Sequence, residues 1–481
     1  MSLLNLNEIL SSVNGKFVGN KNNMSNFGFS SVTTDSRGVC KGSLFVPLIG
    51  QVQDGHKYIP SAIEKGASVI FVAEKEYNSD SEKYNSISEK NENVSFIVVR
   101  DTLKALQDAA AAYVEKFPSL IKVGITGSSG KTTTKEMVVS VLKQKYNVVY
   151  TQGNFNSETG LPLSVFNIRP EHEVGVFELG MNRRDEIGEI AAVLKPKYAL
   201  ITNIGTAHIG ILGSRKNIAV EKRKIFKYLP QDGVAFIPAE DDFSEFLAEN
   251  VRSSVAYYGD SVPEKESGAR YLSDLGLDGT EFSLDGIKIH LKNPGIYNYR
   301  NALGACAVGK TLGLSAGQIK KGLENVDSVN GRMETLSLKL KNGADITLIK
   351  DCYNANPESM CNVLDFCSSL KNAGGKIYVL GDMLELGEKS CSEHERIALK
   401  AEESSPKLVL LVGSEMRHGF EAIQKKGFNN AEYIAAYDND AIAAAGKKIL
   451  MAAVDGDVVL IKASRGIALE RIVSVIDGEE K

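Results

Sequence analysis

The sequence predicts an α/β protein of three domains: a mixed α/β domain, a central domain built on a parallel sheet, and a C-terminal Rossmann-like domain. Its 481 residues match about three domains of ordinary size. From Ile121 onward, strand-sized apolar runs alternate with helix-sized segments, and a second alternation begins after Gly331. Such alternation is typical of parallel sheets covered by helices. We therefore place the domains at residues 1–100, 101–330 and 331–481.

The first domain mixes short strands with helices. Apolar clusters predict strands at residues 45–46, 68–72 and 94–99, and a helix at 58–65. Residues 74–93 are rich in Ser, Asn, Glu and Lys, a composition that predicts a solvated insertion.

The central domain begins with a helix at 101–117, for which Asp101 or Thr102 is a suitable N-cap and Pro118 the stop. Strands are then expected at 122–125, 174–177 and 199–202, and helices at 133–146 and 216–229. Within 271–291 apolar residues recur at every second position, which predicts a small antiparallel patch before a helix at 299–312.

The third domain repeats the alternation of strands and helices but has no GxGxxG loop. Its strands are expected at 346–349, 377–380, 408–412 and 458–461, and its helices at 357–370, 392–403 and 440–454.

Composition excludes several classes of protein. Hydrophobic residues make up 43% of the chain and charged residues 24%, which excludes a disordered, collagen-like or coiled-coil chain. The 56 Lys and Arg against 60 Asp and Glu give a net charge of −4, so no global attraction to nucleic acid is expected. Neither a signal peptide nor a membrane-length apolar run is recognisable, which predicts a cytoplasmic protein without a transmembrane segment. The six cysteines form no CxxC pair and have no zinc-ligand spacing with His, so we expect free thiols.

The clearest motif is a glycine-rich loop between a predicted strand and a predicted helix, reading GITGSSGKTTTKE from Gly124. Five residues separate Gly124 from Gly130, one more than in the common phosphate-binding loop, but the GxxGKT core is intact. Such a loop turns backbone N–H groups towards an anion, Lys131 adds a positive charge, and the Thr132 hydroxyl suits Mg²⁺. The central sheet therefore resembles that of P-loop ATPases. The alternative is a glycine-rich turn with a solvent-facing lysine.

Two polar residues follow predicted strands of the central domain. Glu178 comes directly after the strand at 174–177, and His208 comes shortly after the strand at 199–202. Because the carboxyl ends of parallel strands border the ligand crevice, both are candidates for a metal site. The alternatives are a solvated glutamate and a structural histidine. Lys222 lies on the next predicted helix, where the simpler interpretation is one of several cations on a solvated face.

These motifs together resemble the Mur ligase family, the ATP-dependent ligases that build the peptide of bacterial peptidoglycan precursors. The loop from Gly124 is more similar to that family's version than to a generic Walker A motif. The resemblance covers nearly the whole chain. Segments 34–37 and 42–56 resemble the UDP-binding segment of members with this type of first domain, and GIYNYRNAL, GRME and DCYNANP continue the resemblance from Gly295, Gly331 and Asp351.

Residues 154–163, 351–360 and 381–387 resemble one member of the family in particular, the ligase that joins D-alanyl-D-alanine to UDP-N-acetylmuramoyl-tripeptide. Such an enzyme uses ATP and Mg²⁺ to convert the tripeptide carboxylate to an acyl phosphate, which the amine of the dipeptide then attacks. No protein nucleophile is required, in keeping with the lack of a Ser–His or Cys–His signature. The resemblance implies these two substrates as partners, and we expect a monomer that binds no nucleic acid.

The resemblance also implies roles for individual residues. The nucleotide would be bound by Thr126, Gly127, Ser128, Ser129, Gly130, Lys131, Thr132, Thr133, Asn298, Asn301, Arg332 and Asp351, the last at the ribose. The metal would be bound by Thr132, Glu178, His208 and a carbamylated Lys222, and the catalytic residues would be Lys131, Lys222 and His208. The substrates would contact Ser36, Arg37, His56, Asn154, Asn156, Tyr353 and Asn354. Tyr297 replaces the histidine that the family usually carries before Asn298. Because this site is divided between domains, closure on ligand binding is expected.

Three other kinds of function fit part of this pattern. The first is a related ligase. One candidate is the ligase that acts on the preceding precursor, but its DNPR-type motif is absent from this sequence. Another is a folylpolyglutamate synthetase, but that enzyme lacks a UDP-binding first domain. The second is a P-loop phosphotransferase, which would release a stable phosphorylated product. The third is a non-enzymatic protein that binds ATP only to close. A ligase is distinguished by orthophosphate release that depends on an amine acceptor.

Overall fold

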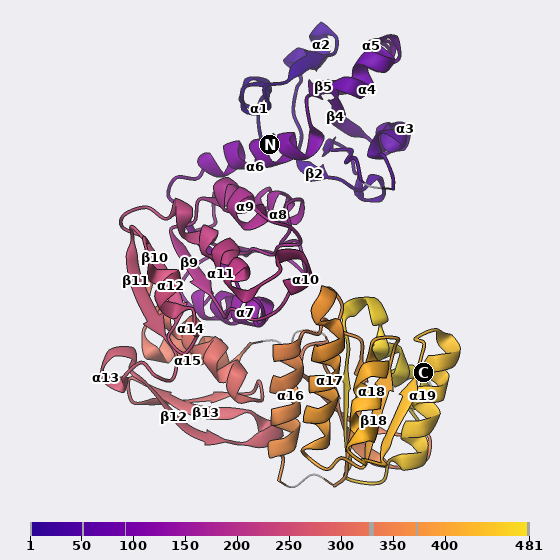
Figure 1. Cartoon of the computed structure of the whole chain (residues 1–481). Helices are drawn as coiled ribbons and strands as arrows, with labels where there is room; N and C mark the ends of the chain where they lie inside the picture. The colour runs from indigo at the N-terminus through magenta and orange to yellow at the C-terminus, as the bar shows by residue number, and fades with distance from the viewer. Residues whose placement is uncertain (1, 51, 92, 327–330, 372–373, 479–481) are drawn as a thin grey trace.

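The computed structural model describes residues 2–50, 52–91, 93–326, 331–371 and 374–478. Three α/β units follow one another along the chain, and in Figure 1 the middle unit lies between the indigo first unit and the orange-to-yellow third unit. The predicted fold class is confirmed. The predicted boundary between residues 330 and 331 borders residues 327–330, which lie outside the described residues.

The first unit contains a five-stranded sheet in the order β1-β5-β4-β3-β2, in which β1 is antiparallel to β5 and the other neighbours are parallel. Its strands are β1 (Lys16–Val18), β2 (Ser31–Thr33), β3 (Ser43–Phe45), β4 (Ala67–Ala73) and β5 (Ser95–Val99), and its helices α1 (Leu6–Val13), α2 (Lys21–Ser25) and α3 (Ile59–Glu64). Strands β1 and β2, each of three residues, were not predicted, because a strand of that length carries no measurable periodicity; the equally short β3 was predicted only at its end, at residues 45–46.

The prediction of a solvated insertion at 74–93 is wrong. The segment forms α4 (Glu74–Ser79) and α5 (Ser81–Lys90), which bury Tyr77 and Tyr84. The ring of Tyr84 packs edge-on against Phe96 at 5.3 Å between centroids. The two tyrosines, with Ile87 packed against the same core, hold a helix pair whose other residues are polar, and the average composition of the segment does not reveal them. Glu92, within the same predicted segment, lies outside the described residues.

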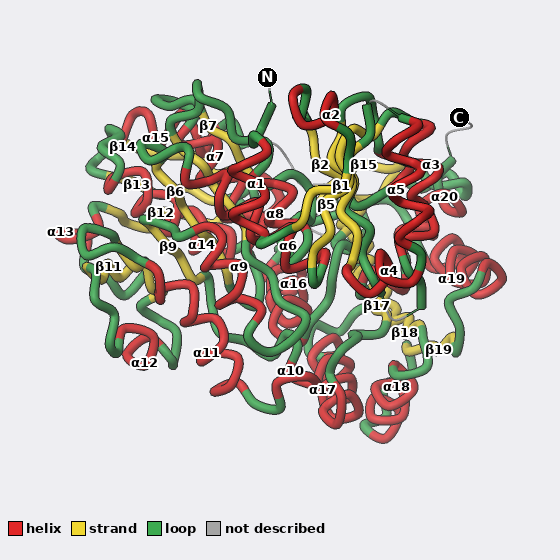
Figure 2. The backbone as a smooth tube through the Cα atoms, turned by 90° about the horizontal axis from the view of Figure 1, so that it is seen from above, coloured by secondary structure: helices red, strands yellow, loops and turns green. Residues whose placement is uncertain are grey.

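Helix α6 (Thr102–Glu115) connects the first unit to the middle one. The Asp101 carboxylate accepts the backbone N–H of Lys104 at 2.9 Å, so the predicted N-cap is Asp101. Seen from above, α1 of the first unit and α8 (Gly160–Val165) of the middle unit both lie beside α6 (Figure 2).

The middle unit is built on a six-stranded parallel sheet in the order β11-β10-β9-β6-β8-β7. Its strands are β6 (Ile121–Thr126), β7 (Val148–Tyr150), β8 (Val174–Glu178), β9 (Tyr198–Ile201), β10 (Val234–Pro238) and β11 (Ser254–Tyr258). Alternate side chains face opposite sides: Leu200 packs with α7 (Lys131–Leu142) and α14 (Ile296–Thr311), whereas Ile201 packs with α9 (Glu186–Leu194) and α11 (Arg215–Arg223). Because β6, β8 and β9 are parallel neighbours, their last residues, Thr126, Glu178 and Ile201, lie at the same edge of the sheet. The candidate site lies at this edge.

Three smaller features complete the middle unit. The predicted antiparallel patch is confirmed as β12 (Ala269–Asp274), β13 (Thr280–Leu284) and β14 (Ile287–Leu291). The predicted helix at 216–229 ends earlier, because α11 passes into a 3₁₀ turn at Lys224–Tyr228. The remaining helices are α10 (Ile209–Leu212), α12 (Ser244–Ala248), α13 (Glu264–Ser267) and α15 (Ala316–Glu324).

The third unit has a six-stranded sheet in the order β15-β16-β20-β17-β18-β19, with an antiparallel edge strand, β15. Its strands are β15 (Glu334–Lys339), β16 (Asp345–Lys350), β17 (Lys376–Gly381), β18 (Leu408–Val412), β19 (Ala431–Ile434) and β20 (Val458–Lys462). Its helices are α16 (Pro357–Ser369), α17 (Ser390–Glu402), α18 (Met416–Lys425), α19 (Asn439–Ala452) and α20 (Ile472–Ile476). All four predicted strands and all three predicted helices are confirmed; β15, β19, α18 and α20 are additional. Within the described residues, no helix has the length and apolar character that a membrane crossing requires.

Candidate active site

The glycine-rich loop lies between the end of β6 and the start of α7, as predicted. Two of its glycines are required by their surroundings. A Cβ on Gly127 would lie 1.8 Å from the Thr202 hydroxyl, and a Cβ on Gly130, which has φ +77°, would lie 2.7 Å from the Asn301 side chain. The loop is therefore pressed between the end of β9 and helix α14, and its backbone can be approached closely only without side chains.

Two lysine amines converge on one carbonyl of this loop. The Nζ atoms of Lys131 and Lys222 each donate to the Gly127 carbonyl at 2.8 Å. Lys222 is only 1% exposed, so the alternative of a solvated helix face is wrong for this residue. Burial and repulsion by Lys131 hold the pKa of Lys222 well below its usual value, and burial likewise lowers the pKa of Lys131, opposed by Glu178. Two ammonium groups at this spacing repel each other, which favours a neutral amine on Lys222.

Glu178 ends β8 with its carboxylate buried. One oxygen, Oε1, accepts the amide N–H of Asn156 at 2.7 Å, while Oε2 is buried without a hydrogen-bond partner. A buried carboxylate oxygen without a partner is costly unless a cation or a ligand group binds it. Among the residues that the structure describes, no cluster of three or more His, Cys, Asp or Glu side chains could hold a metal ion. Mg²⁺ typically takes one or two carboxylates and completes its shell with phosphate oxygens and water, so the orphaned Oε2 suits this ion.

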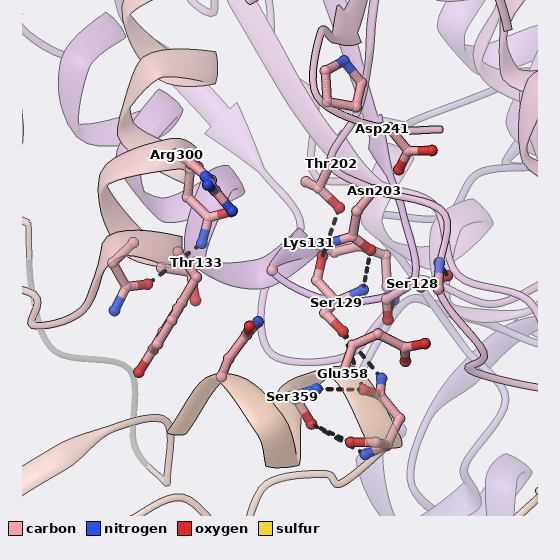
Figure 3. A pocket seen from close by; sticks show the side chains of 18 of the residues that line it. Ser128, Ser129, Lys131, Thr133, Thr202, Asn203, Asp241, Arg300, Glu358 and Ser359 are labelled. Atoms are coloured by element: carbon pink, nitrogen blue, oxygen red, sulfur yellow. Dashed lines mark hydrogen bonds between the residues drawn. The ribbon is translucent and has the colours of Figure 1, made fainter. Parts of the chain in front are cut away.

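The third unit is docked directly on the loop. Arg332 donates to the Thr132 hydroxyl at 3.0 Å, and Asn356 bonds the Ser129 hydroxyl through its amide nitrogen at 3.1 Å. The carboxylate of Glu358 accepts both the backbone N–H of Thr206, at 2.8 Å, and its hydroxyl, at 3.0 Å. Figure 3 shows Glu358 and Ser359, from the start of α16, facing Ser129 of the loop.

The contacts between the two units enclose a cavity of about 470 Å³. This volume is in the range of small-molecule sites. Its walls include the glycine-rich loop, the end of β9 and the start of the third unit. Predicted nucleotide-binding residues that line it are Ser128, Ser129, Gly130, Lys131, Thr133, Asn298, Asn301, Arg332 and Asp351. The structure therefore brings together, at one cavity, predicted residues that lie more than 200 positions apart in the sequence.

Several residues without a predicted role also border this cavity, among them Lys462 and Tyr297. Lys462, 1% exposed at the end of β20, lies 2.5 Å from the Asp351 carboxylate, which it neutralises. The Tyr297 hydroxyl is buried and has no hydrogen-bond partner, and burial holds its pKa well above the usual value, so it stays protonated. It is a neutral donor at a cavity lined by charged, amide and hydroxyl side chains together with a few apolar ones.

Comparisons with known proteins agree with this geometry. Three family models match the chain: "Mur ligase family, catalytic domain" over residues 29–114, "Mur ligase middle domain" over 125–309, and "Mur ligase, glutamate ligase domain" over 331–465. The UDP-N-acetylmuramoyl-tripeptide–D-alanyl-D-alanine ligase of Treponema pallidum is 39% identical over 99% of this chain and 100% of its own length. The chain belongs to the Mur ligase family.

Other proteins that this Mur ligase resembles are the same member of the family. The Bacillus subtilis enzyme of the same name is 34% identical, with 92% of each chain covered. The crystal structure of MurF from Acinetobacter baumannii superposes with a TM-score of 0.82 at 26% identity over 98% of each chain. The Thermotoga maritima MurF structure, solved in complex with ADP, gives a TM-score of 0.76 at 26% identity over 92% of this chain and 96% of that one.

Not every predicted site residue of this Mur ligase faces the cavity. The Thr126 hydroxyl donates to the Leu179 carbonyl at 2.7 Å and so joins β6 to the end of β8. Asn156 supports Glu178, as described above, whereas Asn154 is exposed on the preceding loop. The ring of Tyr353 lies beneath the Arg332 guanidinium at 4.2 Å. Asn354, predicted to bind substrate, lines the same cavity as the loop residues.

The residues predicted to bind UDP lie on the first unit. Both ring nitrogens of His56 are already engaged, Nδ1 at 2.6 Å from Asp54 and Nε2 as acceptor of the Ala73 N–H at 3.0 Å. His56 therefore braces its own loop. Arg37 is exposed and pairs with Asp35, whose pKa it lowers to about 2. Ser36 accepts the amine of Lys65 at its carbonyl and leaves its hydroxyl for other partners.

His208, the remaining predicted metal ligand, caps α10 with a left-handed backbone at φ +64°. Its Nδ1 lies 2.6 Å from the carboxylate of Glu385 in the third unit, and His208 lowers the pKa of that carboxyl.

Sequence reasoning assigned no role to Asn356, Glu358, Lys462 and Glu385. Asn356 had a usable signal, because Asn before Pro at a helix start is a strong N-cap pattern, and its side chain does accept the Ser359 N–H at 2.9 Å.

Proposed function

We propose that this protein is an ATP-dependent ligase that joins D-alanyl-D-alanine to UDP-N-acetylmuramoyl-tripeptide in peptidoglycan precursor synthesis. The observation that carries the proposal is the cavity in which the phosphate loop, Lys131 and the docked third unit meet. Full-length relatives that bear this enzyme's name support the choice of substrates.

The reaction has two steps on the substrate. The terminal carboxylate of the tripeptide attacks the γ-phosphorus of ATP, releases ADP and becomes an acyl phosphate. The amine of D-alanyl-D-alanine then attacks the acyl carbon, loses a proton and expels orthophosphate, which leaves an amide. The loop N–H groups, Lys131 and Arg332 neutralise the charge that develops on the transferred phosphoryl group. The docked third unit excludes water, which would otherwise hydrolyse the acyl phosphate.

Mg²⁺ would be held by Glu178, through its unpartnered oxygen, and by the Thr132 hydroxyl, with His208 and Lys222 at a second ion. When bound, Mg²⁺ supplies charge neutralisation for the phosphate oxygens. Arg332 now occupies the Thr132 hydroxyl, so this guanidinium would have to shift when the ion binds.

Lys222 is proposed to be carbamylated. A neutral lysine amine adds to CO₂ to give a carbamate and a proton, and this places a negative charge beside Lys131 and supplies oxygen ligands that suit a hard cation. The lowered pKa of Lys222 supports this proposal, because it raises the neutral fraction that reacts.

The other predicted residues would contact the two substrates. Ser36 and Arg37 of the first domain would contact the UDP moiety, with His56 bracing the loop, and Asn154, Asn156, Tyr353 and Asn354 would border the peptide substrates. The domains would be divided at residues 1–100, 101–330 and 331–481. The protein is proposed to be a monomer, and ATP together with a UDP-linked substrate supports a cytoplasmic location.

The test is orthophosphate release by the purified protein with ATP, Mg²⁺ and UDP-N-acetylmuramoyl-tripeptide. Release should require D-alanyl-D-alanine and should be weak with D-Ala, L-Lys or D-Glu. A single amino acid that serves better than the dipeptide would show that the choice of family member is wrong. A stable phosphorylated product without an acceptor would support a phosphotransferase, and ATP binding without an amide product would support a non-enzymatic role.

A further inference from the structure

A second contact between the middle and third units lies outside the nucleotide cavity. It joins the start of α10 to the loop after β17. The Gly210 N–H donates to the Glu385 carbonyl at 3.1 Å, and the His208 ring lies against the Glu385 side chain, with Nδ1 2.6 Å from Oε2. In Figure 1, α10 reaches from the middle unit towards the third unit near α17.

This contact depends on unusual backbone at two positions and on a close approach of the backbones at a third. His208 and Glu385 both adopt the left-handed conformation, at φ +64° and +66°, which non-glycine residues rarely occupy. A Cβ on Gly210 would lie 2.7 Å from the Glu385 carbonyl oxygen and from the Gly387 nitrogen, so the two backbones can meet only at glycine. Such positions are retained where the surrounding structure demands them, often at functional sites.

The ring and the carboxylate are close but not aligned as an ideal hydrogen bond, since Nδ1 has no partner by strict geometry. Two acceptors at 2.6 Å would repel each other, so Nδ1 must carry the proton. In a neutral imidazole this leaves Nε2 as the lone-pair nitrogen. A carboxylate at one ring nitrogen commonly fixes the orientation of a histidine whose other nitrogen binds a ligand.

We propose that Glu385 is a positioning residue that couples docking of the third unit to the tautomer and orientation of His208. Undocked, His208 has no carboxylate at Nδ1; docked, its Nε2 is presented as an acceptor. The active site is thereby completed only when the two units are in contact. The role of Nε2 in the reaction rests on the proposed function, whereas the contact between His208 and Glu385 does not.

A purely stabilising role is a poor explanation of the pair. The Glu385 side chain is 49% exposed, and ion pairs with so much solvent contribute about 0–1 kcal/mol to folding. Removing the charge should therefore leave the fold intact, which makes Glu385→Gln a usable probe. Glu388→Gln is the matched control, because Glu388 is exposed three residues along the same loop and makes no ion pair among the described residues.

The first measurement does not depend on turnover. In the full chain labelled with ¹⁵N-histidine, Nδ1 of His208 should be the protonated nitrogen in wild type and in Glu388→Gln, and a mixture of tautomers should appear in Glu385→Gln. Amide exchange at Gly210 should also be faster in Glu385→Gln. An unchanged tautomer and unchanged exchange in Glu385→Gln would overturn the proposal.

The second measurement is kinetic. Glu385→Gln should lower kcat by about 10- to 100-fold and leave the KM for ATP unchanged, because Glu385 does not line the nucleotide cavity. Gly210→Ala, which separates the backbones without touching either side chain, should show the same pattern. The double variant His208→Gln/Glu385→Gln should be no slower than His208→Gln alone. Independent, multiplying losses would mean that Glu385 does not act through His208. If the wild type releases no phosphate with D-alanyl-D-alanine, the proposed function fails, while the tautomer and exchange measurements still decide this inference.

Discussion

Replacing Lys222 by alanine tests the chemistry of the site most directly. Its amine is 1% exposed and donates to the same Gly127 carbonyl as Lys131. A carbamate there would supply oxygen ligands that no other described side chain replaces. We expect Lys222→Ala to lose on the order of 10³-fold in kcat, which corresponds to about 4 kcal/mol of transition-state stabilisation.

Lys224→Ala is the matched control. Lys224 is two residues along, about 200° around the helix from Lys222. Its side chain is 28% exposed and pairs with the exposed Asp185 and with the buried Glu221. The Glu221 carboxylate also accepts the backbone N–H groups of Asp185 and Ile187, so it keeps two donors when Lys224 is removed. The mostly solvated pair with Asp185 contributes less than about 1 kcal/mol, and the control should stay within about fivefold of wild type.

The assay is dipeptide-dependent ADP release in CO₂-free buffer with and without added bicarbonate. Bicarbonate should stimulate the wild type, and formate or acetate should partly restore Lys222→Ala by placing a carboxylate in the vacated space. A ¹³C spectrum of enzyme equilibrated with ¹³CO₂ should show a carbamate signal that is absent from Lys222→Ala. Near wild-type turnover of Lys222→Ala, or no carbamate signal in active wild-type enzyme, would refute the reasoning.

Three further outcomes are expected. Lys131→Ala should lose on the order of 10³-fold in ADP release at saturating ATP, because it removes the charge at the phosphate loop, and near wild-type turnover would exclude Lys131 from the mechanism. Gly127→Ala should abolish ADP binding measured by calorimetry, since its Cβ would lie 1.8 Å from Thr202. The control Gly317→Ala, at an exposed position of α15 with only one side-chain atom within 4 Å, should bind ADP normally and raise the free energy of unfolding by about 0.4–1 kcal/mol. Equal ADP affinities of the two variants would contradict the predicted clash. Finally, burial lowers the pKa of Lys222 in the folded protein below its usual 10.5, so between the folded and unfolded pKa values the unfolded chain binds more protons. The free energy of unfolding of CO₂-free protein should therefore rise with pH across that window. Lys222→Met should flatten this slope in denaturant titrations at several pH values, and an unchanged slope would show that Lys222 does not titrate with a lowered pKa.

Much of the fold could be predicted because its signals are local. Strands such as Leu408–Val412 are continuous apolar runs, and Asp101 caps α6 as its position before the helix suggested. The phosphate loop was equally local, since glycine spacing, lysine and flanking elements all lie within one segment. Where a few anchors in a polar background decide the structure, local composition was misleading: Tyr77 and Tyr84 hold α4 and α5 in a segment predicted to be solvated.

The order of residues along the chain is enough to show which groups are available and on which elements they lie: the loop lysine, the strand-end carboxylate and the histidine after β9. How these groups meet depends on the packing of the elements. Lys222 reaches the Gly127 carbonyl from 95 residues away, and Glu358 reaches Thr206 from 152 residues away. Neither pairing has a local pattern, because each depends on how parallel strands order themselves and on how the third unit docks. Burial follows from the same packing, and burial is what turns Lys222 from an ordinary surface cation into an amine with a strongly lowered pKa.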